Sequence, residues 1–159
     1  MKPSELSLSE RIDLLNWTSA MRMQFEVPTE ERLFNADHKT VSAIIRGLGY
    51  PVTYSRMTKI YAVVDRFNDV WYSGNPHVDY GHVRLILTAK RGNTVLGGLT
   101  VSWVKQLEVH HGIHNDGYPQ MPAFRNYDEL QTILREYFRM YEKFKVAVHE
   151  SGFYASVES

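Results

Sequence analysis

The spacing of hydrophobic residues changes at Asn68, and this change predicts a mixed fold. Before Asn68, apolar residues recur every three or four positions, which is typical of amphipathic helices. After it, short β-branched and aromatic runs at 70–74, 82–90 and 94–104 predict strands, with a hairpin turn at 91–93. We therefore expect an α+β fold with about four helices and an antiparallel sheet of three or four strands.

Helix-capping patterns predict where the first helices lie. A capping box at residues 7–10 predicts a first helix that runs to about Phe25, and a shorter helical piece follows at 30–34. Asp37 is expected to cap the next helix, which Gly49 would end because glycine readily adopts the left-handed conformation.

A long helix is predicted at the C-terminal end. Asn126, followed three residues later by Glu129, forms a second capping box, and Gly152 would end the helix. Apolar and aromatic residues recur at helical spacing on the face expected to point inward, namely Leu130, Ile133 or Leu134, Tyr137, Met140 or Tyr141, and Phe144. We expect this face to pack on the sheet.

Residues 53–67 admit two interpretations. Met57, Ile60, Val64 and Phe67 lie at the spacing of one helical face, so Thr53 could cap a helix here. The β-branched residues between 60 and 64 leave a strand as the alternative.

Length and composition set the broad class of protein. The 159 residues fit a single domain, 1–159, with a core large enough to fold without metal or disulfide. The absence of cysteine excludes disulfides and thiolate chemistry and favours an intracellular, cytoplasmic protein. No apolar run approaches the roughly 18 residues that a membrane span needs, so we expect no membrane partner.

The neutral net charge conceals a basic segment in the middle of the chain. Residues 38–66 contain five basic side chains and one acidic one, whereas residues 1–37 contain four basic and seven acidic ones. The segment also reads as two helical patterns joined at Gly49-Tyr50-Pro51. A helix-turn-helix reads DNA with its second helix in the major groove while basic residues contact phosphates.

The first functional hypothesis is therefore a small nucleic-acid-binding or regulatory protein with a basic centre like a helix-turn-helix. Its predicted contact residues are Arg46, Tyr54, Arg56, Lys59 and Arg66. Apolar positions of the second helix come two residues later than the motif requires, so a helix pair with a solvated basic face is the alternative.

A histidine-rich segment gives the second hypothesis. His110, His111, His114 and Asp116 lie within seven residues, and imidazole and carboxylate groups are ligands that zinc accepts. These four residues are the predicted metal site of a metal-dependent or histidine-based hydrolase. Their spacing matches no established metal motif, and a solvated loop is the alternative.

The third hypothesis is a protein–protein interaction module or inhibitor without catalysis. Its contact surface would be the aromatic stretch 72–80 and the loop 118–124, because tyrosine and tryptophan are enriched at such surfaces. A long tyrosine-rich terminal helix and an open sheet edge also make a homo-oligomer plausible. No phosphate-binding glycine loop or catalytic signature is present, so the sequence identifies neither a cofactor nor catalytic residues.

Overall fold

The computed structural model describes residues 3–84, 86–99, 101–113 and 121–150. Within these ranges the helices are α1 (Pro3–Arg11), α2 (Leu14–Gln24), the 3-10 helix η1 (Thr29–Glu31), α3 (His38–Gly47), α4 (Val101–His110) and α5 (Tyr127–Glu150). The strands are β1 (Thr53–Ser55), β2 (Ile60–Phe67), β3 (Val70–Gly74), β4 (His77–Asp79), β5 (His82–Arg84), β6 (Leu87–Arg91) and β7 (Thr94–Leu99). The predicted α+β class is confirmed.

The seven strands form one antiparallel sheet in the order β5-β4-β2-β3-β6-β7, and β1 pairs with the other edge of β2. Strands β3 and β4 both pair with β2, and they are separated only by Asn75 and Pro76. They therefore act as one bent strand. The backbone N–H of Asn75 donates to the carbonyl of Ile86 (2.9 Å), which joins this bend to the gap between β5 and β6. Tyr80 and Gly81, both with positive φ, make the tight turn between β4 and β5.

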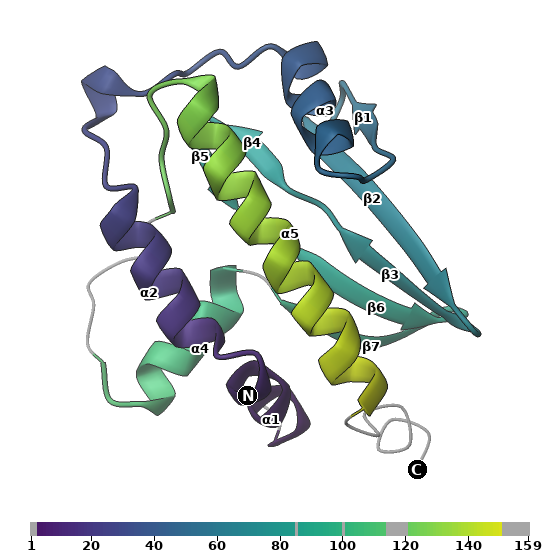
Figure 1. Cartoon of the computed structure of the whole chain (residues 1–159). Coiled ribbons are helices and arrows are strands. Elements are labelled where there is room, and N and C mark those ends of the chain that lie inside the picture. The colour runs from purple at the N-terminus through teal and green to yellow at the C-terminus, as the bar shows by residue number, and fades with distance from the viewer. Residues whose placement is uncertain (1–2, 85, 100, 114–120, 151–159) are drawn as a thin grey trace.

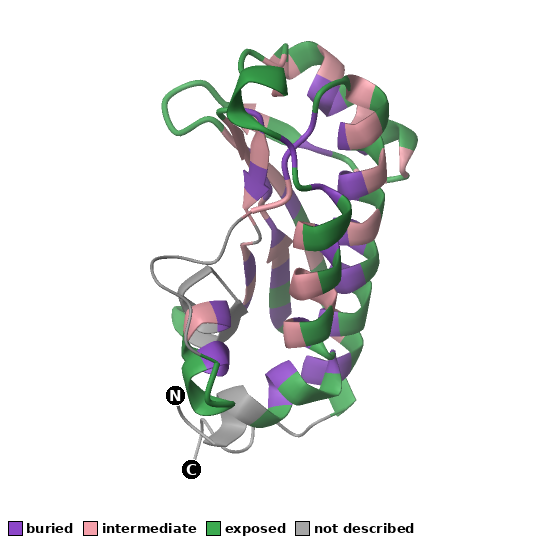
Figure 2. Cartoon of the chain, turned by 90° about the vertical axis from the view of Figure 1, so that its left-hand side faces the viewer, coloured by how far each residue is buried: buried purple, intermediate pink, exposed green. Residues whose placement is uncertain are grey.

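Helix α5 packs along one face of the sheet, and α3 lies beside it over β1 and the start of β2 (Figure 1). Buried residues line the space between α5 and the sheet, whereas the outer side of the helix is exposed (Figure 2). All the residues predicted to face inward on the C-terminal helix are buried, namely Leu130, Ile133, Leu134, Tyr137, Met140, Tyr141 and Phe144. The predicted packing of this helix on the sheet is confirmed.

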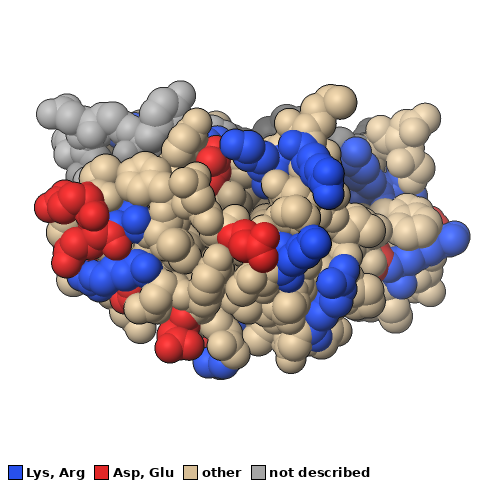
Figure 3. Space-filling model, turned by 90° about the horizontal axis from the view of Figure 1, so that it is seen from above, with Lys and Arg blue, Asp and Glu red and all other residues tan. Residues whose placement is uncertain are grey.

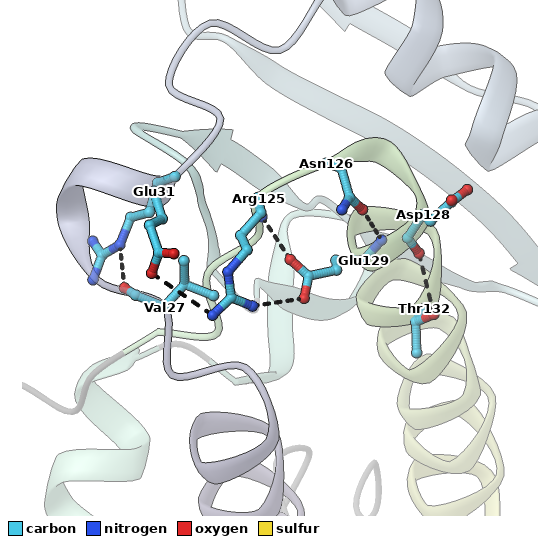
Figure 4. A network of polar contacts seen from close by, with 8 residues as sticks. Val27, Glu31, Arg125, Asn126, Asp128, Glu129 and Thr132 are labelled. Carbon is cyan, nitrogen blue, oxygen red and sulfur yellow. Dashed lines mark hydrogen bonds and ion pairs between the residues drawn. The ribbon is translucent and has the colours of Figure 1, made fainter.

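The start of α5 is fixed by a polar network that reaches η1 (Figure 4). The side chain of Asn126 accepts a hydrogen bond from the Glu129 backbone N–H (2.9 Å), as the capping pattern predicts. The Glu129 carboxylate accepts from the backbone N–H of Arg125 (2.8 Å) and pairs with its guanidinium (3.1 Å). The same guanidinium lies 3.9 Å from Glu31 in η1, so the network links two segments that are distant in sequence.

Residues 122–124 join the N-terminal segment to the sheet. Phe124 donates its backbone N–H to Gly81 beside β5 (2.9 Å), and Ala123 donates to the carbonyl of Phe25 (3.0 Å). Leu33 donates in turn to the carbonyl of Phe124 (2.9 Å). This connection covers the edge of β5 with the backbone of the segment that leads into α5.

The prediction of a second helix over 53–67 is wrong. These residues form β1 and β2, so the strand alternative for 60–64 is confirmed, and residues 38–66 do not form a helix-turn-helix. The residues with helical spacing do not form a buried face, because Met57 is 94% exposed in the β1–β2 turn and Val64 is 54% exposed. The buried positions, Tyr61 and Val63, follow the two-residue period of a strand instead.

Other boundaries differ from the prediction for local reasons. The first helix is split at Asp13, which has a positive φ, and its first part begins at Pro3. The predicted strand 82–90 is divided into β5 and β6, and the strand expected over 94–104 ends at Leu99. Residues 101–110 form α4, where Val104 and Leu107 are buried one helical turn apart. The sheet consequently has more strands than predicted.

None of the described helices combines the length and the apolar character that crossing a lipid bilayer requires.

Candidate nucleic-acid interface

The central strands of the sheet present two chemically different faces. On β2, Tyr61 and Val63 are buried and Asp65 contacts α5, so these residues face the helices. Successive side chains of a strand point to opposite faces, which places Val64 and Arg66 on the other face. Within the described part of the chain, no helix covers this second face at β2 and β3 (Figure 1).

A row of three side chains crosses this open face. Arg66 on β2 is the register partner of Trp71 on β3, and Trp71 is the register partner of Lys90 on β6. The Arg66 guanidinium carbon lies 5.1 Å from the centroid of the Trp71 ring, which is a cation–π contact. Trp71 remains 46% exposed, and Lys90 is exposed as well. The row thus combines an accessible aromatic ring with two cations.

The residues beside this row are small or apolar. Val64 pairs with Ser73, and Ser73 pairs with Thr88 on β6. None of these side chains carries a charge, so the surface next to the row is uncharged.

A second charged group lies at the β4–β5 end of the same face. His77 is the register partner of Arg84, and Asp79 is the partner of His82. The His77 Nε2 atom lies 3.7 Å from Asp79 Oδ2. Burial lowers the pKa of His77 despite this carboxylate, because the charges of Arg84 and Lys59 act in the same direction as burial. Burial and the charge of Arg84 likewise lower the pKa of His82.

Cations outnumber carboxylates on this face. Among the described residues of β2–β6, the charged side chains on it are Arg66, Arg84, Lys90 and Asp79, and the β1–β2 turn adds Arg56 and Lys59. Figure 3 shows the end of the molecule that is uppermost in Figure 1. In this view Lys and Arg predominate on the side of α3, β1 and β2, and Asp and Glu gather on the other side. The neutral chain is therefore electrically asymmetric.

The structure separates the residues that were predicted to contact nucleic acid. Arg56 and Lys59 are exposed in the β1–β2 turn, and Arg66 lies near the other end of β2 on the open face. Arg46 belongs to α3 and donates to the carbonyl of Val52 (3.3 Å). Tyr54 is stacked between other rings on the helix-covered side, 4.8 Å from the ring of His38 and 4.6 Å from that of Tyr61. Three of the five predicted residues thus border the open face, and two do not.

Trp71 and Arg84 were not predicted from the sequence as part of a binding surface, whereas Lys90 was expected at the tip of a hairpin beside the basic segment. The sequence does indicate that Trp71 lies on the opposite face from the apolar Val70 and Tyr72, because the three residues alternate in a predicted strand. The pattern did not show which of the two faces α5 would cover, and that choice decides whether Trp71 is exposed.

The predicted metal site lies partly outside the described residues. His110 and His111 are at the end of α4, with ring centroids 5.4 Å apart, whereas His114 and Asp116 fall in the segment 114–120 that is not described. Among the residues that are described, no three His, Asp or Glu side chains are arranged to hold a metal ion. Metal binding at 110–116 stays a prediction.

The predicted protein-contact surface is divided in a similar way. Tyr72 and Phe124 are buried in the core, so they offer no contact surface. Tyr80, in the β4–β5 turn, is exposed and packs edge-on against Phe34 with ring centroids 6.5 Å apart. Residues 118–120 of the loop 118–124 lie outside the described residues.

No protein-family model matches the sequence, and neither a curated protein nor a solved structure matches it.

Proposed function

We propose that this protein binds single-stranded nucleic acid across the open face of its sheet. The observation that carries the proposal is the row Arg66–Trp71–Lys90, in which an accessible ring lies between two cations on three adjacent strands. Proteins that bind single strands combine a positive surface for the backbone with aromatic side chains on which bases stack. Both elements occur on this face.

The geometry favours a single strand over a duplex. Stacking on Trp71 requires a base whose face is accessible, and in a duplex both faces are covered by neighbouring base pairs. The second part of the basic segment, residues 53–66, folds as strands and a turn, so the segment offers no second helix to follow α3 into the major groove. From Arg66 the basic residues continue to Lys59 and Arg56, about 23 Å along β2 at the rise of an extended strand. A flexible strand can follow this path and contact both groups of cations.

Fluorescence anisotropy with labelled 12-nucleotide single-stranded DNA and RNA, and with a duplex of the same sequence, tests the proposal. We expect tighter binding of the single strands and an affinity that falls with salt. Trp71→Ala should weaken binding about tenfold, because stacking contributes about 1–3 kcal/mol per base. The matched control is Arg139→Ala with Lys143→Ala, which removes two cations from the exposed side of α5. No binding at 50 mM salt would overturn the proposal, as would unchanged binding by folded Trp71→Ala.

The exposed apolar side chains Val64 and Trp71 support a second candidate function, a protein-interaction module whose partner is another protein or a second copy of the chain. Sedimentation velocity over a range of concentrations tests the second-copy version. Val64→Glu should abolish any self-association, because it places a charge in the middle of the apolar surface. A monomer at all concentrations would exclude self-association through this face.

A further inference from the structure

One edge of β2 is unpaired along most of its length. Strand β1 pairs only with Ile60–Ala62, and no other described strand pairs with the same edge between Val63 and Phe67. The last turns of α5 run alongside this open edge. Between them lies a cleft of about 370 Å³, whose lining includes Asp65, Phe67, Tyr72, Lys145 and His149. Arg66 also lines it, so the cleft begins where the row on the open face ends.

A carboxylate is held in fixed orientation at this cleft. Asp65 Oδ2 accepts hydrogen bonds from the Tyr141 hydroxyl (2.8 Å) and from Lys145 Nζ (3.1 Å). Lys145 Nζ is also 3.0 Å from a Glu142 carboxylate oxygen and 4.5 Å from the centroid of the Tyr141 ring. Burial, followed by the hydrogen bond to Asp65, raises the pKa of Tyr141, so its hydroxyl stays protonated and remains a donor. Asp65 Oδ1 accepts no hydrogen bond from the described residues.

Aromatic rings border the same space. Phe67 is exposed and lies edge-on to His149, with ring centroids 4.9 Å apart and planes at 90°. Tyr72 is buried and lies 6.5 Å, centroid to centroid, from Phe144 beneath the cleft. A planar heterocyclic ring therefore has apolar rings to contact and a free carboxylate oxygen within the same cleft.

We infer that this cleft receives one nucleobase of the bound strand and selects a base that carries an exocyclic amino group. The inference rests on the proposed function. Because Arg66 belongs both to the open-face row and to the cleft, a strand that crosses the row is led around the edge of β2 to Asp65. The free Oδ1 accepts a hydrogen bond from the amino group of adenine, cytosine or guanine. Thymine and uracil have no amino group, and their one ring donor, N3–H, lies between two carbonyl oxygens that repel the carboxylate.

The experiment compares 12-nucleotide oligothymidylate with oligomers that differ by one adenine, cytosine or guanine, placed at each position in turn. Wild-type protein should bind the oligomers with an amino-bearing base at the favoured position about tenfold more tightly, as expected for a hydrogen bond to a charged group. Asp65→Asn, whose amide both donates and accepts, should lose this preference while still binding oligothymidylate. Phe67→Ala should reduce it through loss of the ring contact.

Asp69→Asn is the matched control, because Asp69 is a carboxylate outside the cleft that pairs with Arg91 (3.0 Å). It should keep the wild-type preference. Equal affinity of the wild type for all the oligomers would overturn the inference, as would a preference that survives in both Asp65→Asn and Phe67→Ala. The proposed function fails separately, since it requires Trp71-dependent binding of oligothymidylate itself. Trp71-dependent binding without a base preference would therefore support the proposed single-strand binding and overturn only the inference that the cleft selects a base.

Discussion

The ring of Tyr141 on α5 lies against Gly74 on β3. A Cβ atom built on Gly74 would be 3.2 Å from Cδ1 and 3.3 Å from Cγ of this ring. These distances are shorter than ordinary carbon contacts, so the missing side chain is what allows the helix to approach the sheet here. The same ring carries the hydroxyl that holds Asp65.

Gly74→Ala should therefore lower the free energy of unfolding by about 1–3 kcal/mol, the usual cost of adding a methyl group to a packed interior. Urea denaturation measures the change. Gly47→Ala is the control, because a Cβ built in that last turn of α3 meets no other described part of the molecule within 4 Å, apart from the helix's own backbone. It should raise stability by about 0.5–1 kcal/mol, as alanine for glycine does in a helix. Equal effects of the two substitutions would contradict the packing argument.

Tyr137→Phe should be more destabilising than other losses of a tyrosine hydroxyl. The buried Tyr137 hydroxyl donates to the carbonyl of Ile86 (2.8 Å) and accepts from its backbone N–H (3.2 Å). Removing it leaves the buried Ile86 N–H without a partner, at a cost of about 1–3 kcal/mol in the free energy of unfolding, whereas the Ile86 carbonyl keeps its hydrogen bond from the Asn75 N–H (2.9 Å). Tyr127→Phe, which removes a single exposed hydrogen bond that the Tyr127 hydroxyl accepts from the Asp37 N–H, should cost less. Thermal denaturation of both variants tests this order.

Stability should depend on pH through His77 and His82. The pKa of each is lowered in the folded protein, chiefly by burial and then by Arg84, and Arg32 adds to the effect at His82. The unfolded chain therefore binds protons first as the pH falls. The stabilising contribution is fully present above the unfolded pKa of about 6.5 and is lost as the pH falls toward the folded pKa. Denaturant unfolding between pH 8 and 5 measures the loss, and the double variant His77→Gln with His82→Gln should show a smaller one.

The salt dependence of oligonucleotide binding should report the two cations of the row. Arg66→Ala combined with Lys90→Ala should reduce the slope of log affinity against log salt by about 1.4, because each phosphate contact on a single strand contributes about 0.7. The slope is measured by anisotropy between 50 and 200 mM salt. An unchanged slope with weaker binding would show that these residues act by shaping the surface and not by pairing with phosphates.

Sequence patterns predicted the elements whose period is sustained. Helix α5 repeats its apolar positions from Leu130 to Val148 and begins at a capping residue, so both its face and its start were predictable. Asp37 caps α3 as expected, with its side chain accepting from the Thr40 N–H (3.2 Å). In each case the local pattern and the tertiary contacts favour the same structure.

The spacing of apolar residues predicted the wrong secondary structure where the local sequence favours one structure and the tertiary contacts favour another. Ile60 and Val64 are compatible with a helical stripe, but the strand places Tyr61 and Val63 against the core and leaves Val64 exposed. Asp13 itself adopts a left-handed conformation and interrupts a continuous helical pattern. The sequence gives no sign of this break, because no glycine is present there. The candidate interface was only partly predictable for the same reason, since basic residues are visible in a sequence and the uncovered face of a sheet is not.

The backbone connection at residues 122–124 has a consequence for the order of folding. Within the sheet most pairings join strands that are close along the chain, and such pairings close short loops at little entropic cost. The link from Ala123 to Phe25 closes a far longer loop, so we expect it to form after α5 has docked. Native-state hydrogen exchange tests this, because amides of α2 should then open at lower free energy than those of β3 and α5. The N-terminal third would then be the part of the molecule most readily released, while the sheet and its long helix remain folded.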